Sequence, residues 1–100
     1  MKKEEVIKIL QKHRKDIEKF GVKRIGLFGS VARDEANEKS NIDFVVEFEK
    51  GKATFKNFGG LIEFLENLFH REIDILTPEG IKSIRIKSVR ERIKKEVEYV

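Results

Sequence analysis

The residues of this sequence best suited to chemistry begin with a glycine–serine pair, Gly29-Ser30, which follows the apolar run 22–28. Glycine lets a ligand approach the backbone closely, and the free N–H groups at the start of a helix attract anions. Ser30 can cap a short helix that begins here, or donate its hydroxyl to a phosphate oxygen. Arg33 can direct further donors at the same anion. A capped helix after a strand is common, so this pattern alone does not establish an anion site.

Two aspartates inside apolar runs strengthen the case for a ligand site. Asp43 lies near the start of the run 42–48 and Asp74 lies within 72–76, and both runs are typical of buried strands. A carboxylate in a buried strand is unfavourable unless it is paired or binds a metal ion. Asn41 shares a strand face with Asp43, because side chains alternate along a strand. Together with the anion site, these residues predict a pocket for Mg²⁺ and a nucleotide, since Mg²⁺ is usually held by one or two carboxylates plus substrate phosphates.

Helices and strands in alternation must position these residues. Apolar residues recur at helical spacing over 2–20, and Gly21 is expected to end that helix because it tolerates a positive φ. The same spacing over 55–69 predicts a second long helix with a phenylalanine-rich core face. Either this helix begins after Gly59-Gly60, or close packing at the pair excludes side chains. The predicted elements are helices over 2–20, 30–36 and 55–69, strands over 22–28, 42–48 and 72–76, and one or two basic helices reaching Tyr99.

The element order α-β-α-β-α-β-α predicts an α/β (α+β) fold, a small mixed sheet with flanking helices in two or three layers. The 100 residues suffice for one domain over 1–100, without a separate substrate domain. Cysteine is absent, which excludes disulfides and thiolate chemistry. No apolar stretch approaches the roughly 20 residues of a membrane span, and the charged N-terminus is unlike a signal peptide, so we expect a cytoplasmic protein.

The net charge of +4 is modest, and its clearest basic excess lies in 82–95. That excess fits a solvated face of the molecule, which is the simpler interpretation. The alternative is a surface for an acidic partner or for nucleic acid. His13 is interpreted as a partly buried helix residue rather than a ligand, and Tyr99 as a frayed aromatic terminus.

These motifs resemble the DNA polymerase β-like nucleotidyltransferase superfamily, in which Gly-Ser, a short helix, Asp-x-Asp and a later strand aspartate recur. The resemblance is closest to the minimal nucleotidyltransferase branch, antitoxins that pair with HEPN (higher eukaryote and prokaryote nucleotide-binding) ribonuclease toxins. Residues 29–33 resemble its Gly-Ser-x-Ala-Arg, and residues 71–79 resemble its Arg-Lys-Val-Asp-Leu-Val-Thr-Pro-Glu segment. The likeness covers essentially the whole chain.

The resemblance implies a role for each matching residue. Gly29 and Ser30 would bind the β- and γ-phosphates of a nucleotide, and Arg33 would assist them, or else form a surface ion pair with Asp34 or Glu35. Asp43 would ligate Mg²⁺, and Asp74 would ligate the catalytic metal ion and help to deprotonate the acceptor hydroxyl. The implied activity is transfer of AMP from ATP to a tyrosine of a HEPN toxin. Neither a membrane nor nucleic acid is expected as a partner, and a homo-oligomer is left open.

Asn41 departs from this family pattern, which has aspartate at that position. An amide oxygen is a weaker metal ligand because it carries no charge. At an effective dielectric constant near about 20, one missing charge at metal-contact distance is worth several kcal/mol. Two hypotheses follow: an adenylyltransferase impaired by Asn41, or an antitoxin that neutralises its toxin by binding alone. Asp34 and His70 stand where the branch has glycine; we expect Asp34 to lie in solvent and His70 to adopt a left-handed conformation.

Overall fold

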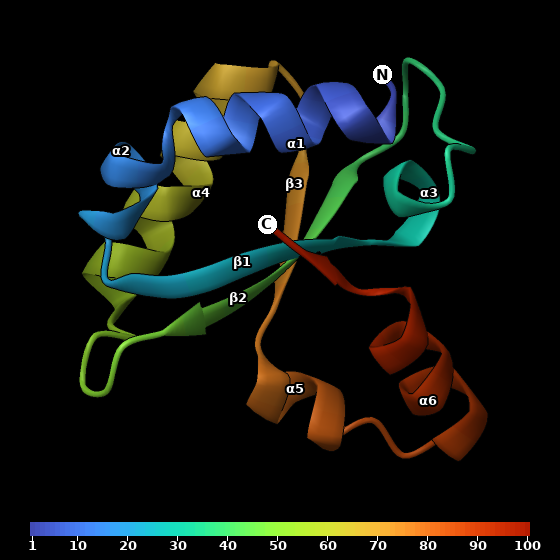
Figure 1. Cartoon of the computed structure of the whole chain (residues 1–100). Coiled ribbons are helices and arrows are strands. Elements are labelled where there is room, and N and C mark those ends of the chain that lie inside the picture. The colour runs from blue at the N-terminus through green and yellow to red at the C-terminus, as the bar shows by residue number, and fades with distance from the viewer.

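The computed structural model describes residues 1–100 and is built around a four-stranded sheet (Figure 1). The strands lie in the order β3-β2-β1-β4. β1 and β2 are antiparallel and β2 and β3 are parallel, so the sheet is mixed. The three predicted strands are present, and a short fourth strand follows the last helix. Their bounds are β1 (Val22–Phe28), β2 (Ile42–Phe48), β3 (Ile73–Leu76) and β4 (Glu98–Tyr99).

Helices cover both faces of this sheet, which makes three layers and confirms the predicted fold class. Figure 1 shows α1, α2 and α4 on one side of the sheet and α5 and α6 on the other, with α3 at the end of β1. None of these helices is both long and apolar enough to cross a membrane. Their bounds are α1 (Lys3–Lys12), α2 (Arg14–Glu18), α3 (Gly29–Ala32), α4 (Phe55–Phe69), α5 (Pro78–Lys82) and α6 (Lys87–Glu96).

β2 supplies side chains to two hydrophobic clusters, one on each face of the sheet. Phe44 and Val46 join the larger cluster beneath α1 and α4, whereas Val45 joins the smaller cluster with Ile81 and Ile93 of α5 and α6. The three β2 residues are 0% exposed, as predicted for a strand buried on both faces. Burial of each such side chain contributes about 1.5–3 kcal/mol. β2 is therefore the buried centre of the sheet, and the nearby site lies at its beginning.

The predicted helix over 2–20 is divided in two at His13, so the prediction of one continuous helix was wrong. The His13 ring packs edge-on against Phe64, with centroids 6.1 Å apart, and its Nδ1 lies 3.4 Å from an Asp16 carboxylate oxygen. These contacts hold His13 at the junction of α1 and α2. Gly21 has a φ of +78° and follows α2, as its predicted role as a helix terminator requires.

α4 contains the glycine pair, because the helix begins at Phe55 with Thr54 as its cap. A Cβ on Gly60 would lie 2.8 Å from Phe20 Cε1, so close packing explains this glycine, whereas Gly59 faces open space. The prediction that the whole phenylalanine stripe is core was wrong for Phe55. Its side chain is 99% exposed because it occupies the first turn, ahead of the face that α4 buries.

Three terminal and turn residues refine the other predictions. His70 has a φ of +55° and ends α4 in the left-handed conformation, as expected. Asp34 also has a φ of +55°, and its carboxylate accepts a hydrogen bond from the Lys3 N–H at 2.9 Å. The short helix predicted over 30–36 ends early, since α3 stops before this turn. Tyr99 is not a frayed terminus: it pairs with Gly26 in the sheet.

Candidate active site

β2 and β3 place the two predicted aspartates side by side at one end of the sheet. Asp43 and Asp74 are register partners in parallel strands, so their side chains leave the same face about 4.8 Å apart along the sheet. Asp43 also pairs across the sheet with Phe28, the last residue of β1. The structure therefore places the two carboxylates on neighbouring strands, as their apolar runs predicted, with Asp43 directly beside Gly29.

Gly29 can be replaced by no larger residue without disturbing Asp43. Its φ of +76° lies in the left-handed region, which side chains disfavour. A Cβ at this position would also collide with Oδ2 of Asp43. The carboxylate thus packs directly against the Gly29 backbone, which explains why a glycine ends β1 here.

The environment of Asp43 opposes its ionisation. Burial, repulsion by Asp74 and a hydrogen bond between the two carboxyl groups raise the pKa of Asp43 to about 6, against the attraction of Arg33. Asp74 is exposed, because β3 lies at the edge of the sheet, so the expected burial of this carboxylate was wrong. The pair carries an excess of negative charge that a cation would relieve.

Asn41 is hydrogen-bonded to the second carboxylate. Its Nδ2 donates to Asp74 Oδ2 at 3.0 Å, so the amide nitrogen rather than the amide oxygen faces Asp74. An aspartate here would instead add a third negative charge. Asn41 therefore supports Asp74 with a hydrogen bond but contributes no negative charge to the site.

The two carboxylates fit the Mg²⁺ that the resemblance implies. They are adjacent oxygen ligands, and burial together with the negative charge of Asp74 raises the pKa of Asp43 in spite of the nearby Arg33. No group of three or more His, Cys, Asp or Glu side chains is placed to hold a metal ion, so the other ligands would come from water and phosphate oxygens. Neither aspartate lines a surface hollow, and the site is open.

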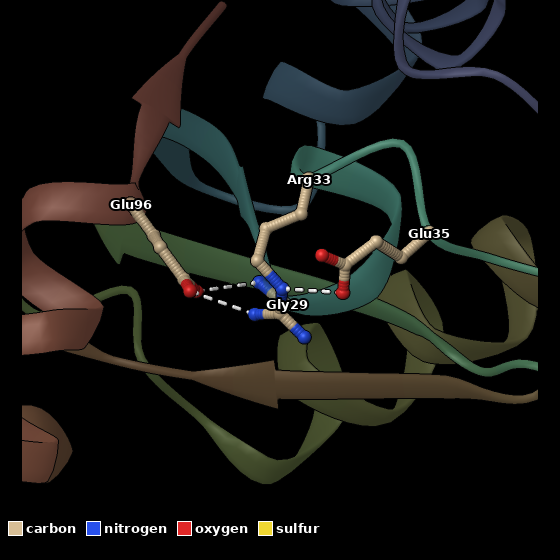
Figure 2. A network of polar contacts seen from close by, with 4 residues as sticks. All are labelled: Gly29, Arg33, Glu35 and Glu96. Carbon is tan, nitrogen blue, oxygen red and sulfur yellow. Dashed lines mark hydrogen bonds and ion pairs between the residues drawn. The ribbon is translucent and has the colours of Figure 1, made fainter.

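A polar network occupies the predicted anion-binding groups (Figure 2). The Gly29 N–H donates to Glu96 Oε2 at 3.1 Å, and Arg33 Nη1 donates to Glu96 Oε1 at 2.7 Å. Arg33 Nε donates to Glu35 Oε2 at 3.1 Å, so Glu35, and not Asp34, is its neighbouring ion-pair partner. The hydrogen bonds to Glu35 and Glu96 raise the pKa of the Arg33 guanidinium above its ordinary value.

Sequence reasoning missed the place of Glu96 in this network. The contact joins positions 67 residues apart, which no local pattern reveals. One signal was present: Glu96 ends α6, where a negative charge opposes the helix dipole, after a turn carrying Lys94 and Lys95. An acidic residue at the C-terminal end of a basic helix is a candidate for an ion pair with a basic residue elsewhere in the chain.

Ser30 and Arg71 complete the surroundings of the site. No side chain caps α3, so the cap role predicted as one option for Ser30 is not the one observed. Arg71 Nη1 donates to the carbonyl oxygens of Asn37 at 2.6 Å and Ser40 at 3.2 Å. Arg71 therefore tethers the loop that leads into Asn41, a positioning contact that the sequence did not single out.

Comparisons with known proteins agree with this geometry. A model of the nucleotidyltransferase domain family matches residues 4–100. The protein adenylyltransferase MntA of Thermococcus cleftensis is 39% identical over 98 residues, which cover 97% of this chain and 94% of that protein. A Methanocaldococcus jannaschii relative, provisionally named a protein adenylyltransferase, is 40% identical over 98 residues, covering 96% and 95% of the two chains.

Solved structures share the fold. One, provisionally described as a minimal nucleotidyltransferase, has a TM-score of 0.75 at 30% identity and covers 98% of this chain and 95% of its own. A chain in the crystal structure of a toxin–antitoxin with AMP-PNP has a TM-score of 0.61, covering 99% and 72% of the two chains, and at 16% identity its likeness concerns the fold alone. The family model, the relatives and the paired aspartates lead to one conclusion: this chain belongs to the nucleotidyltransferase family, among its minimal members.

Proposed function

We propose that this chain is a protein adenylyltransferase that acts as an antitoxin. It transfers AMP from ATP to a tyrosine hydroxyl of a cognate HEPN ribonuclease toxin, in the cytoplasm, and thereby silences the toxin. The observation that carries the proposal is the pairing of Asp43 with Asp74 beside the left-handed turn at Gly29. The named activity of the relatives supports AMP as the transferred group, and the toxin–antitoxin with AMP-PNP supports a toxin partner and an adenine nucleotide.

Each site residue has a role that its position allows. The Gly29 amide and the Ser30 hydroxyl bind the β- and γ-phosphates, with Arg33 beside them. Asp74, the more exposed carboxylate, accepts the proton of the acceptor hydroxyl, whose oxygen attacks the α-phosphorus as pyrophosphate leaves. Asp43 and Asp74 together would hold Mg²⁺, which when bound neutralises charge on the phosphates. The open site leaves room for a tyrosine presented by a whole protein.

Transfer of label from α-labelled ATP to a co-expressed toxin tests this proposal. We expect the native chain to label the toxin with Mg²⁺ or Mn²⁺, and Asp43→Asn and Asp74→Asn to lose the labelling. Glu63→Gln is the matched control, because Glu63 is an exposed carboxylate on α4, outside the site. Absence of transfer with every divalent metal ion would exclude the enzymatic activity.

A second candidate function is neutralisation of the toxin by binding alone. Asn41 favours it, because the site lacks a third carboxylate and the amide already occupies one oxygen of Asp74. Growth rescue by Ser30→Ala and Asp43→Ala variants, without label transfer, would support this function. Loss of rescue in the same variants, with the complex still forming, would support the enzyme.

A further inference from the structure

The carboxylate of Glu96 lies on donors that the proposed function assigns to nucleotide phosphates (Figure 2). We propose that Glu96 is a built-in competitor of the nucleotide, which occupies the phosphate position in the free chain and leaves it when nucleotide binds. This inference rests on the proposed function and adds a regulating residue to the same site. Glu96 thereby sets the nucleotide concentration at which the site fills.

Glu96 imitates a phosphate group in its contacts. One carboxylate oxygen accepts from the Gly29 backbone N–H and the other accepts from the Arg33 guanidinium. Phosphate oxygens use the same two kinds of donor in charge-assisted hydrogen bonds. The Glu96 side chain is only 16% exposed, whereas Glu35, the other partner of Arg33, is 64% exposed. Of the two carboxylates, Glu96 is the one held inside the site.

The charges of the network make the two anions mutually exclusive. Burial opposes the ionisation of Glu96, but hydrogen bonds from Arg33 and Gly29 outweigh it and hold the pKa of Glu96 below its ordinary value. Glu35 and Glu96 place two negative charges against the one positive charge of the Arg33 guanidinium. A phosphate that binds here needs the Gly29 N–H and the Arg33 guanidinium, which already donate to the negatively charged Glu96. The Glu96 carboxylate must therefore leave before the phosphate can bind.

The backbone next to Glu96 is anchored, so the side chain and not the helix must move. Beyond Glu96, Tyr99 pairs with Gly26, and the Val100 N–H donates to the Ile25 carbonyl at 2.9 Å. The Arg24 guanidinium also lies 4.0 Å from the centroid of the Tyr99 ring. These contacts can persist while the flexible Glu96 side chain rotates into solvent.

Binding of α,β-methylene ATP, whose α–β bridge resists cleavage, tests the competitor role without any transfer chemistry. Calorimetry with Mg²⁺ would give Kd for the native chain, Glu96→Gln and Glu96→Ala. We expect both variants to bind about tenfold more tightly, because each has lost the competing charge-assisted hydrogen bonds. Glu35→Gln is the matched control, since it removes a carboxylate from Arg33 but leaves Gly29 occupied. Its Kd should change by less than about threefold.

The direction of the change decides between competition and simple support of the site. If Glu96 only positioned Arg33 and Gly29, its removal would weaken nucleotide binding. Weaker or unchanged binding by both variants overturns the proposal, provided that thermal unfolding shows that both variants are folded. If the Glu96 variants bind nucleotide more tightly but the native chain transfers no label, Glu96 is a competitor and the proposed enzymatic activity is wrong. If the native chain transfers label but the Glu96 variants bind nucleotide no more tightly, only the competitor role of Glu96 is wrong. If neither the native chain nor any variant binds nucleotide measurably, the competitor role and the proposed enzymatic activity are both wrong.

Discussion

Asp43 is ionised at neutral pH against the preference of its surroundings, because burial and Asp74 both favour its protonated form. The shift of its pKa from 3.8 to about 6 corresponds to roughly 3 kcal/mol. Partial exposure to solvent reduces this to about 1–2 kcal/mol. A charge that weakens the fold and lies beside a possible ligand position is typical of a functional site.

Asp43→Asn is expected to stabilise the fold in a pH-dependent way. The folded pKa of about 6 lies above the unfolded value of 3.8, so the ionised carboxylate destabilises the native chain fully above pH 6. This penalty is lost as the pH falls from 6 towards 4. Urea unfolding should therefore find the variant about 1–2 kcal/mol more stable at pH 8 and equal to the native chain near pH 4. A stability difference that does not vary with pH would contradict the assignment; Glu63→Gln serves as the control.

Asn41→Asp should exchange a hydrogen bond for repulsion and gain a metal ligand. With EDTA, we expect Tm to fall, since loss of the bond to Asp74 and the added charge cost about 1–2 kcal/mol. With Mg²⁺, the variant should recover more Tm than the native chain and transfer AMP faster. Asn41→Ala is the control, because it loses the hydrogen bond without adding charge. Equal Mg²⁺ responses and equal rates in all three chains would show that the third carboxylate is not what limits the site.

The sequence predicts a site residue well when its position follows from nearby residues, and poorly when it follows from contacts with distant parts of the chain. Gly29 and Asp43 could be placed because a strand end and strand periodicity are local properties, and Asp74 followed from a similar apolar run. The exposure of Asp74 could not be inferred, since it depends on which strand lies at the sheet edge. Glu96 could not be placed either, because its partner lies across the molecule.

Among the elements, the three strands and α4 were predicted well, whereas β4 and the break between α1 and α2 were not. β1 and β2 have the bounds that the sequence suggested, and α4 begins and ends as its apolar spacing indicates. β4 has only two residues, too few to show alternation, so pairing with β1 alone defines it. At the break between α1 and α2, His13 packs against Phe64 of a distant helix, a contact that local spacing does not report.

The two adjacent glycines of α4 should respond oppositely to alanine. Gly59→Ala places a methyl group in open space inside a helix and should stabilise the chain by about 0.5–1 kcal/mol. Gly60→Ala brings a Cβ to 2.8 Å from the Phe20 ring, and should destabilise by about 1–3 kcal/mol as the ring is displaced. Urea unfolding of both variants measures the difference. Changes of the same sign in both variants would refute the packing explanation.

Across the whole molecule, the site is assembled from distant parts of the chain. β2 and β3 supply the carboxylates, the end of β1 supplies the turn, and α6 returns Glu96 to it. The β4 pairing and the ion pair between Lys3 and Glu98 hold the last residues against the first helix and the sheet. Because these segments meet only in the folded chain, a ligand at the site should stabilise the whole fold.

Stabilisation by Mg²⁺ should therefore depend on pH through Asp43. An ion that binds only the folded chain raises the free energy of unfolding, and the increase grows with the ratio of ion concentration to Kd. At an ion concentration of one hundred times Kd the increase is about 2.7 kcal/mol. Below pH 6 the raised pKa keeps the Asp43 carboxyl group protonated, so Mg²⁺ must compete with a proton for its oxygens. We expect Mg²⁺ to raise Tm clearly at pH 8 and little at pH 5. The Asp43→Asn variant should show a small response at both values, because its amide cannot supply the charge. A native Mg²⁺ response of equal size at pH 5 and pH 8 would mean that the ion binds elsewhere, away from the Asp43–Asp74 pair.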